Sequence, residues 1–130
     1  MIRKATAEDV PFILEMERKY FRYPRLRIDI EDFYVDDLLR GYADMKTVID
    51  EGYIGNVCVS EEFRRQGIAD ALIDKLMETD LSFITLEVRE SNIPAINLYK
   101  KHGFVQEGIL RNHYSDPKED GLVMTVRNYL

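Results

Sequence analysis

The sequence has few of the residues that metal sites and disulfide-rich scaffolds require. Its 130 residues include one cysteine, two histidines and no tryptophan. A single cysteine cannot form a disulfide within the chain, and one cysteine with two histidines does not make a structural zinc site. We therefore expect no bound metal. The cysteine, Cys58, lies inside an apolar run, which favours a small buried side chain over a nucleophile.

Long hydrophobic runs, internal repeats and flexible linkers are absent from the sequence as well. No apolar run approaches the roughly 20 residues that a membrane-spanning helix needs. The first residues, MIRKATAEDV, lack the apolar core of a signal peptide. We therefore expect a single domain, residues 1–130, that lies in the cytoplasm and has no membrane partner.

Basic residues are fewer than acidic ones, 18 against 24, which gives a formal net charge of −6 at pH 7. This balance argues against a nucleic-acid partner that is bound non-specifically. Hydrophobic residues nevertheless make up 45% of the chain, as in a folded globular domain. A local basic pocket is compatible with the overall charge, and Arg64 with Arg65 is the candidate for it.

The pattern between residues 53 and 77 predicts a strand, a tight loop and a helix. Tyr53 to Val59 is apolar, Ser60 to Gln66 is charged and small, and helical spacing starts at Gly67. The unpaired N–H groups of a helix N-terminus attract anions, and the small residues Gly67 and Ala69 keep side chains away from them. The sequence therefore predicts an anion site suited to a pyrophosphate. The apolar residues of the helix are Ile68, Ala71, Leu72 and Leu76.

The stretch after this helix completes a β-α-β unit. Phe83 to Val88 predicts a buried parallel strand, and two strands joined by a helix of this length form a right-handed unit. Ser91 or Asn92 is the expected cap of a further helix. Two last strands, Phe104 to Gly108 and Leu122 to Val126, are expected on either side of a polar loop.

The carboxyl ends of the two parallel strands are where a ligand is expected. In open α/β sheets ligands bind there, and the loop at 60–67 follows the first strand. Glu87 lies near the end of the second strand, and Asn92 and Tyr99 come after it. These side chains could converge on one cleft. The alternative is that Glu87 is a solvated surface carboxylate and Tyr99 a core residue.

The first half of the chain predicts two helices and little strand. Asp29 is the expected cap of the second helix, which would run to about Tyr42. This leaves only Met45 to Gly52 as strand material, so the hairpin before Tyr53 is expected to be short or incomplete. The apolar residues expected on the second helix are Phe33, Leu38 and Leu39.

The first helix has a capping box, Thr6 with Asp9, and Pro24 ends the helical pattern. The segment between the two predicted helices, Phe21 to Arg27, reads FRYPRLR and mixes aromatic and basic residues. It fits a plain helix connector and a wall of a substrate groove equally well. The sequence leaves these two interpretations open.

These motifs together resemble one family. Arg64 to Ala69, RRQGIA, resembles the R/Q-x-x-G-x-G/A signature of the GCN5-related N-acetyltransferases, the GNAT superfamily. Leu86 to Phe104, LEVRESNIPAINLYKKHGF, is similar to that family's second half. The segments IRKATAEDVPFILEME and RNHYSDPKEDGLVM extend the resemblance. Within the family, these segments most resemble the protein N-α-acetyltransferases, including those that act on the alanine N-terminus of a ribosomal protein.

The resemblance implies an α/β fold, an α+β sandwich of the GNAT type. Its sheet would be mixed and mostly antiparallel, with helices on both faces. A central parallel β-α-β pair would be splayed at the acetyl-CoA site.

The resemblance also implies roles for individual residues. Glu87 matches the position of the general base, which usually acts through water, and Tyr99 matches the general acid. The cofactor would lie on backbone or side-chain groups of Val57, Cys58, Val59, Arg64, Arg65, Gln66, Gly67, Ile68, Ala69, Asp70 and Asn92. The substrate would lie on Phe21, Pro24, His113 and Tyr114, of which the last two stand where the family often has a tyrosine pair.

The expected activity is transfer of acetyl from acetyl-CoA to the N-terminal amine of a protein or peptide, by direct attack in a ternary complex. Two alternatives stay open: acetylation of a small amine or a lysine side chain, and a non-catalytic acyl-CoA-binding module. The sequence does not say which N-terminal residues are accepted, whether an auxiliary subunit is needed, or whether the chain is a monomer or a homodimer.

Overall fold

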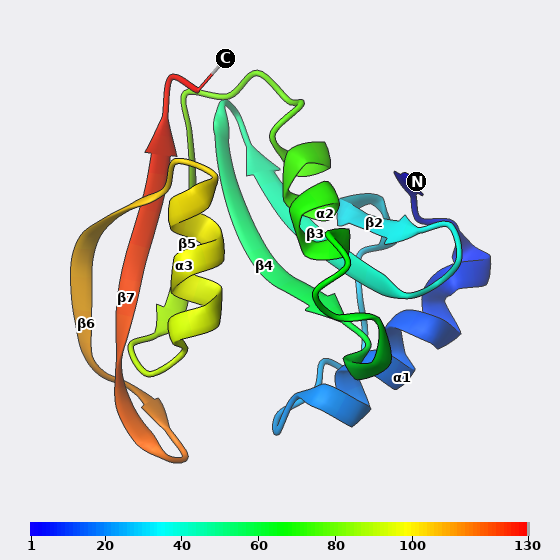
Figure 1. The fold of residues 1–130 in the computed structure, drawn as a ribbon, viewed down its shortest axis with the longest axis horizontal. Coiled ribbons are helices and arrows are strands. Elements are labelled where there is room, and N and C mark those ends of the chain that lie inside the picture. The colour runs from blue at the N-terminus through cyan, green and yellow to red at the C-terminus, as the bar shows by residue number, and fades with distance from the viewer. Residues whose placement is uncertain (130) are drawn as a thin grey trace. The chain divides into compact units, whose positions relative to one another are not determined.

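A computed structural model describes residues 1–129 of the chain and divides into two compact units (Figure 1). Unit 1 comprises Met1–Lys46 and Gly55–Glu78, and unit 2 comprises Thr47–Ile54 and the residues from Thr79 onward. Among the described residues, 1–129, no helix is both long and apolar enough to cross a membrane. The elements are β1 (Ile2–Lys4), η1 (Ala7–Asp9), α1 (Val10–Tyr20), η2 (Ile30–Asp32), β2 (Phe33–Asp36), β3 (Gly41–Val48), β4 (Glu51–Val59), η3 (Glu61–Phe63), α2 (Ile68–Leu76), β5 (Phe83–Arg89), α3 (Ile93–Lys101), β6 (Val105–Ser115) and β7 (Lys118–Arg127).

The strands form a mixed sheet in the order β1-β2-β3-β4-β5-β7-β6. The β1–β2, β2–β3, β5–β7 and β6–β7 pairs are antiparallel, whereas β4 and β5 are parallel. The parallel ladder joins Glu51, Gly52 and Tyr53 to Phe83, Ile84 and Thr85, and β4 then continues to Val59. The predicted mixed, mostly antiparallel sheet with one parallel pair is confirmed.

Helix α1 covers one face of the strands of unit 1. Ile13 and Met16 recur on its inner face and are buried in a cluster with side chains of β2, β3 and β4. Helix α2 contacts β1 and β2, yet its buried residues lie outside this cluster. The two helices therefore cover opposite faces. The strand residues of the cluster are Phe33, Val35, Tyr42 and Cys58.

The segment from Asp29 to Tyr42 is not the helix that its pattern predicts. It forms one short 3-10 turn and the strand β2, in which Phe33 and Val35 are fully buried at the two-residue period of a strand. Leu38 and Leu39, expected on a buried helical face, are 70% and 39% exposed because they lie in the turn between β2 and β3. The prediction of a second helix here was wrong.

The hairpin of β3 and β4 is complete, so the expectation that it is short or incomplete was wrong too. Strand β3 runs over Gly41–Val48 and is joined to β4 by Ile49 and Asp50. Gly41 meets the partner strand so closely that a Cβ atom would lie 2.8 Å from the Cys58 carbonyl oxygen. This close approach, and not a turn, explains the glycine.

In unit 2, α3 packs on the β5–β7–β6 part of the sheet (Figure 1). The Asn92 side-chain oxygen accepts a hydrogen bond from the Ala95 N–H at 3.3 Å, so Asn92 is the predicted cap of α3. The segment from Arg111 to Gly121, expected to be a loop, belongs mostly to β6 and β7. Its polar sequence did not indicate strands, because charged pairs such as Arg111–Asp120 take the place of an apolar alternation here.

Candidate active site

The anion site predicted in unit 1 lies at the start of α2. Gly67 precedes the helix with φ +81°, and its carbonyl accepts the Ala71 N–H at 3.0 Å. A Cβ atom on Gly67 would meet nothing within 4 Å, so the chain leaves open space in front of the first helical turn. Arg65, Gln66 and Gly67 are all exposed. The backbone here is accessible to an anionic ligand.

Arg64, the first arginine of the motif, is bound to neighbouring residues of unit 1. Its Nε donates to the Val59 carbonyl oxygen at 3.0 Å, and its guanidinium lies 5.1 Å from the centre of the Tyr20 ring. The Tyr20 hydroxyl in turn accepts the Glu61 N–H at 2.8 Å. Arg64 therefore fastens the loop to the end of β4, although Arg64 and Arg65 are both exposed.

Cys58 is buried in the core of unit 1, as the sequence predicts. Burial raises the pKa of its thiol to about 11, although the nearby Arg64 charge lowers it. A nucleophilic cysteine requires the thiolate, which this environment disfavours. Its neighbours Val57 and Val59 are half-buried and buried, so side chains of this strand serve packing.

We expect Cys58 to react with a thiol reagent about 100-fold more slowly at pH 8 than an exposed cysteine, because its pKa is raised from 9.0 to about 11 and the thiolate fraction falls accordingly. The rate of colour release from a disulfide dye measures this, since the sequence has no other thiol. The same dye in denaturant provides the control. Rapid labelling of the folded protein would contradict the prediction.

The loop after α1 is held by a buried network that the sequence patterns did not reveal. Arg25 donates to both carboxylates of the network, with Nη2 lying 3.0 Å from Glu17 Oε2 and 2.9 Å from Asp44 Oδ1. The Asn56 side chain donates to Glu17 at 2.9 Å, and the Asn56 N–H donates to Asp44 at 3.0 Å. The Tyr42 hydroxyl also donates to Glu17. Residues from α1, the loop, β3 and β4 are thereby joined.

Electrostatics explain why Glu17 is charged although only 1% of it is exposed. Burial alone would raise its pKa, but hydrogen bonds from Arg25 and Tyr42 outweigh this and hold the pKa at about 2. Burial, and then the bond to Glu17, raise the pKa of Tyr42. One sequence signal was available: Glu17 lies four residues after Ile13, on the apolar face of α1, where a charge needs a partner.

The predicted substrate residues of unit 1 differ in their surroundings. Phe21 packs against the apolar cluster under α1, so it contributes to the core. Pro24 is half-buried beside Arg25, and Tyr23 is exposed. Arg25 ties this loop to β3 through Asp44, which is compatible with a helix connector and with a wall of a substrate groove.

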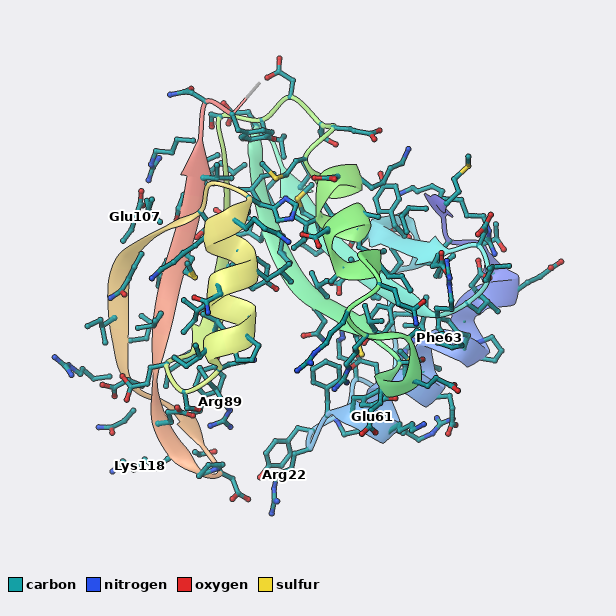
Figure 2. The ribbon with its side chains drawn as sticks, viewed as in Figure 1. Arg22, Glu61, Phe63, Arg89, Glu107 and Lys118 are labelled. Carbon is teal, nitrogen blue, oxygen red and sulfur yellow. The ribbon has the colours of Figure 1, made fainter. Side chains whose placement is uncertain are left out.

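Unit 2 brings three of the predicted residues together. His113 Nε2 lies 3.4 Å from Glu87 Oε1, and the His113 and Tyr114 rings meet edge to face at 4.8 Å. Burial, and then the Glu87 charge, raise the pKa of Tyr114. Arg89, labelled in Figure 2, lies 4.3 Å from the centre of the Tyr114 ring. Carboxylate, imidazole and phenol thus form one cluster on the sheet.

Tyr99 lies in α3, and Asn92 is the N-cap residue of that helix. The Tyr99 ring is buried and packs edge to face on Phe104 at 5.7 Å. Asn92 uses its side-chain oxygen in the helix cap and not its amide group. The Tyr99 ring is therefore part of the core, as one of the two interpretations of the sequence predicts. The expected role as general acid concerns the Tyr99 hydroxyl.

The comparisons with known proteins agree with this architecture: the chain belongs to the acetyltransferase (GNAT) family, whose model matches residues 7–104. An N-alpha-acetyltransferase of Sulfurisphaera tokodaii is 33% identical over 135 residues, which span 94% of this chain and 80% of that protein. The crystal structure of the ribosomal-protein-S18-alanine N-acetyltransferase from Escherichia coli has a TM-score of 0.83 at 26% identity, with 98% of this chain and 92% of that chain covered. Arabidopsis thaliana NAA60, solved with acetyl-CoA, shares the fold with a TM-score of 0.85 at 20% identity, with 98% of both chains covered.

Proposed function

We propose that this protein transfers the acetyl group of acetyl-CoA to the N-terminal α-amine of a protein or peptide, in a ternary complex and as a single catalytic domain. Family membership and the relatives that act on protein N-termini support this. The observation that carries it is the open, exposed backbone at Gly67 in front of α2. Because ribosomal proteins are a substrate class of one relative, we propose the cytoplasm as the compartment.

The residues around α2 fit the pyrophosphate of acetyl-CoA. The first N–H groups of a helix have no partner within it, and they carry the positive end of its dipole. The missing side chain at Gly67 and the exposed Arg65 complete an anion site. We assign the pyrophosphate to the backbone from Arg65 to Asp70, the acetyl carbonyl and pantetheine to the backbone of Val57, Cys58 and Val59, and a further pantetheine contact to the Asn92 amide.

Acetyl-CoA supplies a thioester, and the protein must then move two protons. A peptide α-amine ordinarily has a pKa of roughly 7.7 to 8.0, so it must lose a proton before it attacks. Glu87, half-exposed on β5, is suited to accept that proton directly or through water. The Tyr99 hydroxyl is assigned the return of a proton to the leaving thiolate. Each such transfer contributes roughly 10² to 10⁴ in rate.

Tyr99→Phe is expected to lower kcat about 100-fold while the affinity for acetyl-CoA changes less than about two-fold. The substitution removes only the hydroxyl, and the ring contact with Phe104 is kept, so the fold is retained. Steady-state kinetics and calorimetric titration with CoA measure the two effects. An unchanged kcat would contradict the acid role of Tyr99.

A panel of short peptides tests the function as a whole. We expect acetylation of peptides with free N-termini and none of N-terminally blocked peptides that contain lysine or of polyamines. Equal turnover of the blocked peptides would contradict the N-terminal specificity. Binding of CoA without turnover of any amine would instead favour the non-catalytic module.

A further inference from the structure

The contact between Glu87 and His113 joins two strands that are not neighbours. Glu87 belongs to β5 and His113 to β6, and β7 lies between these strands in the sheet. Side chains of strands separated by a third strand are ordinarily kept apart by the side chains of the strand between them. The two groups nevertheless approach to 3.4 Å. Some feature of β7 must therefore allow the His113 ring to reach over this strand to Glu87.

That feature is Gly121. It pairs with Arg89 on one side and Leu110 on the other, so it lies at the crossing point of β7. A Cβ atom there would lie 3.2 Å from His113 Cδ2 and 3.2 Å from Tyr114 Cε2. Gly121 does not have a positive φ, so its conformation does not require glycine. The missing side chain provides space for the His113 ring.

A β-bulge in β6 turns the ring in this direction. The ladder between β6 and β7 is irregular between Leu110 and Tyr114, and Asn112 has a φ of +53°. The Asn112 N–H donates to Asp120 Oδ1 at 2.8 Å, which holds the bulge. Bulges commonly re-aim a side chain beside a functional site.

The nearby cation Arg89 is paired with groups other than Glu87, so the His113 imidazole is the partner of the Glu87 carboxylate. Arg89, two residues further on β5, pairs with Glu119 at 3.0 Å, donates to the Pro117 carbonyl oxygen at 2.9 Å and lies over Tyr114. Its positive charge is thereby directed toward the β6–β7 hairpin. Glu87 and His113 are 49% and 37% exposed, so a substrate amine or water can reach both.

We infer that Glu87 and His113 act as one proton-accepting pair for the substrate amine, assembled across Gly121; this rests on the proposed function. A carboxylate beside Nε2 favours the tautomer with its proton on Nε2, which leaves Nδ1 as the acceptor. The ammonium gives its proton to Nδ1, and the freed lone pair forms the C–N bond as the C–S bond breaks. The second proton that the attacking nitrogen must lose passes, by way of the Tyr99 hydroxyl, to the leaving thiolate, and the imidazolium later releases its proton to water. Imidazole is the side chain that ordinarily exchanges protons between pH 5 and 8.

His113→Gln is expected to lower kcat/KM for a free-amine peptide about 100-fold at pH 7. The deficit should shrink to less than about 10-fold at pH 9, where the peptide amine is already deprotonated. The double variant with Glu87→Gln should be no more than about 3-fold slower than the slower single variant, because paired groups act as a unit. His102→Gln, the other histidine of the sequence, is the matched control and should keep the wild-type rate. A full rate for His113→Gln at pH 7 would overturn the inference, as would strictly multiplicative losses.

Gly121→Ala tests the assembly without altering either partner. We expect it to reproduce the loss of His113→Gln, with thermal unfolding checked separately. An NMR measurement that needs no substrate distinguishes failure of the proposed function from failure of the Glu87–His113 pair. Glu87→Gln should shift the ring signals of His113 and not those of His102. That shift in a protein that acetylates no peptide would refute the proposed function alone. An active protein without the shift would refute the pair alone.

Discussion

Replacing Gly67 by glutamate is expected to abolish acetyl-CoA binding, and with it all activity. The new side chain would extend into the open space before α2, where the structure places no other atom within 4 Å of the Cβ position. Its carboxylate would repel the pyrophosphate and occupy the helix N–H groups itself. The fold should survive, since the cost is limited to a positive φ of +81° at a non-glycine residue, roughly 1 to 2 kcal/mol.

Two substitutions at the same position separate charge from strain. Gly67→Ala carries the same strained φ without a charge, and Gly67→Gln has nearly the size of glutamate without its charge. We expect measurable CoA binding for both in calorimetric titration and none for Gly67→Glu. If Gly67→Glu bound CoA within about 10-fold of the wild type, the pyrophosphate would have to lie elsewhere.

The second large effect is expected on stability, from Arg25→Leu. This change leaves Glu17 and Asp44 buried near each other without their shared cation. Removing one partner of a buried ion pair is strongly destabilising, and for the partly exposed Arg25 we expect a loss of about 3 kcal/mol in the free energy of unfolding. Urea denaturation followed by circular dichroism measures it. Arg18→Leu, which breaks only the exposed pair with Glu15, is the matched control and should change stability little.

The pH dependence of this loss has a definite sign. The pKa of Glu17 is lowered from 4.5 to about 2 in the folded protein, so its contribution to stability is present above about pH 4.5 and lost as the pH falls to 2. The difference between the wild type and Arg25→Leu should therefore be largest near pH 7 and shrink below pH 4.5. A difference that stays constant down to pH 3 would contradict the charged network.

Local patterns were sufficient for the β-α-β core of the chain. The spacing of Ile68, Leu72 and Leu76 identified α2, and the run from Phe83 to Val88 identified β5, because each is a regular element bounded by clear stop signals. The loop between β4 and α2 followed from the same patterns. The family resemblance then supplied roles that spacing alone does not give.

The errors lie where local preference and tertiary contacts disagree. Leu38, Leu39 and the Asp36–Arg40 pair have helical spacing, yet the buried Phe33 and Val35 decided the conformation of this segment. The Arg25 network and the role of Gly121 were not predictable, because their partners are distant in sequence. The roles of Arg25 and Gly121 depend on neighbours in space, which the local sequence does not identify.

Strand β4 has a consequence for how this chain folds. Its first residues, Glu51–Ile54, belong to unit 2 and the remainder, Gly55–Val59, to unit 1, so each unit is built from two separate segments. No single cut in the chain releases either unit as a continuous fragment. Early local contacts cannot complete either unit, because each must wait for residues synthesised after a segment of the other. Completing either unit therefore requires contacts between residues far apart in the sequence, which slow folding.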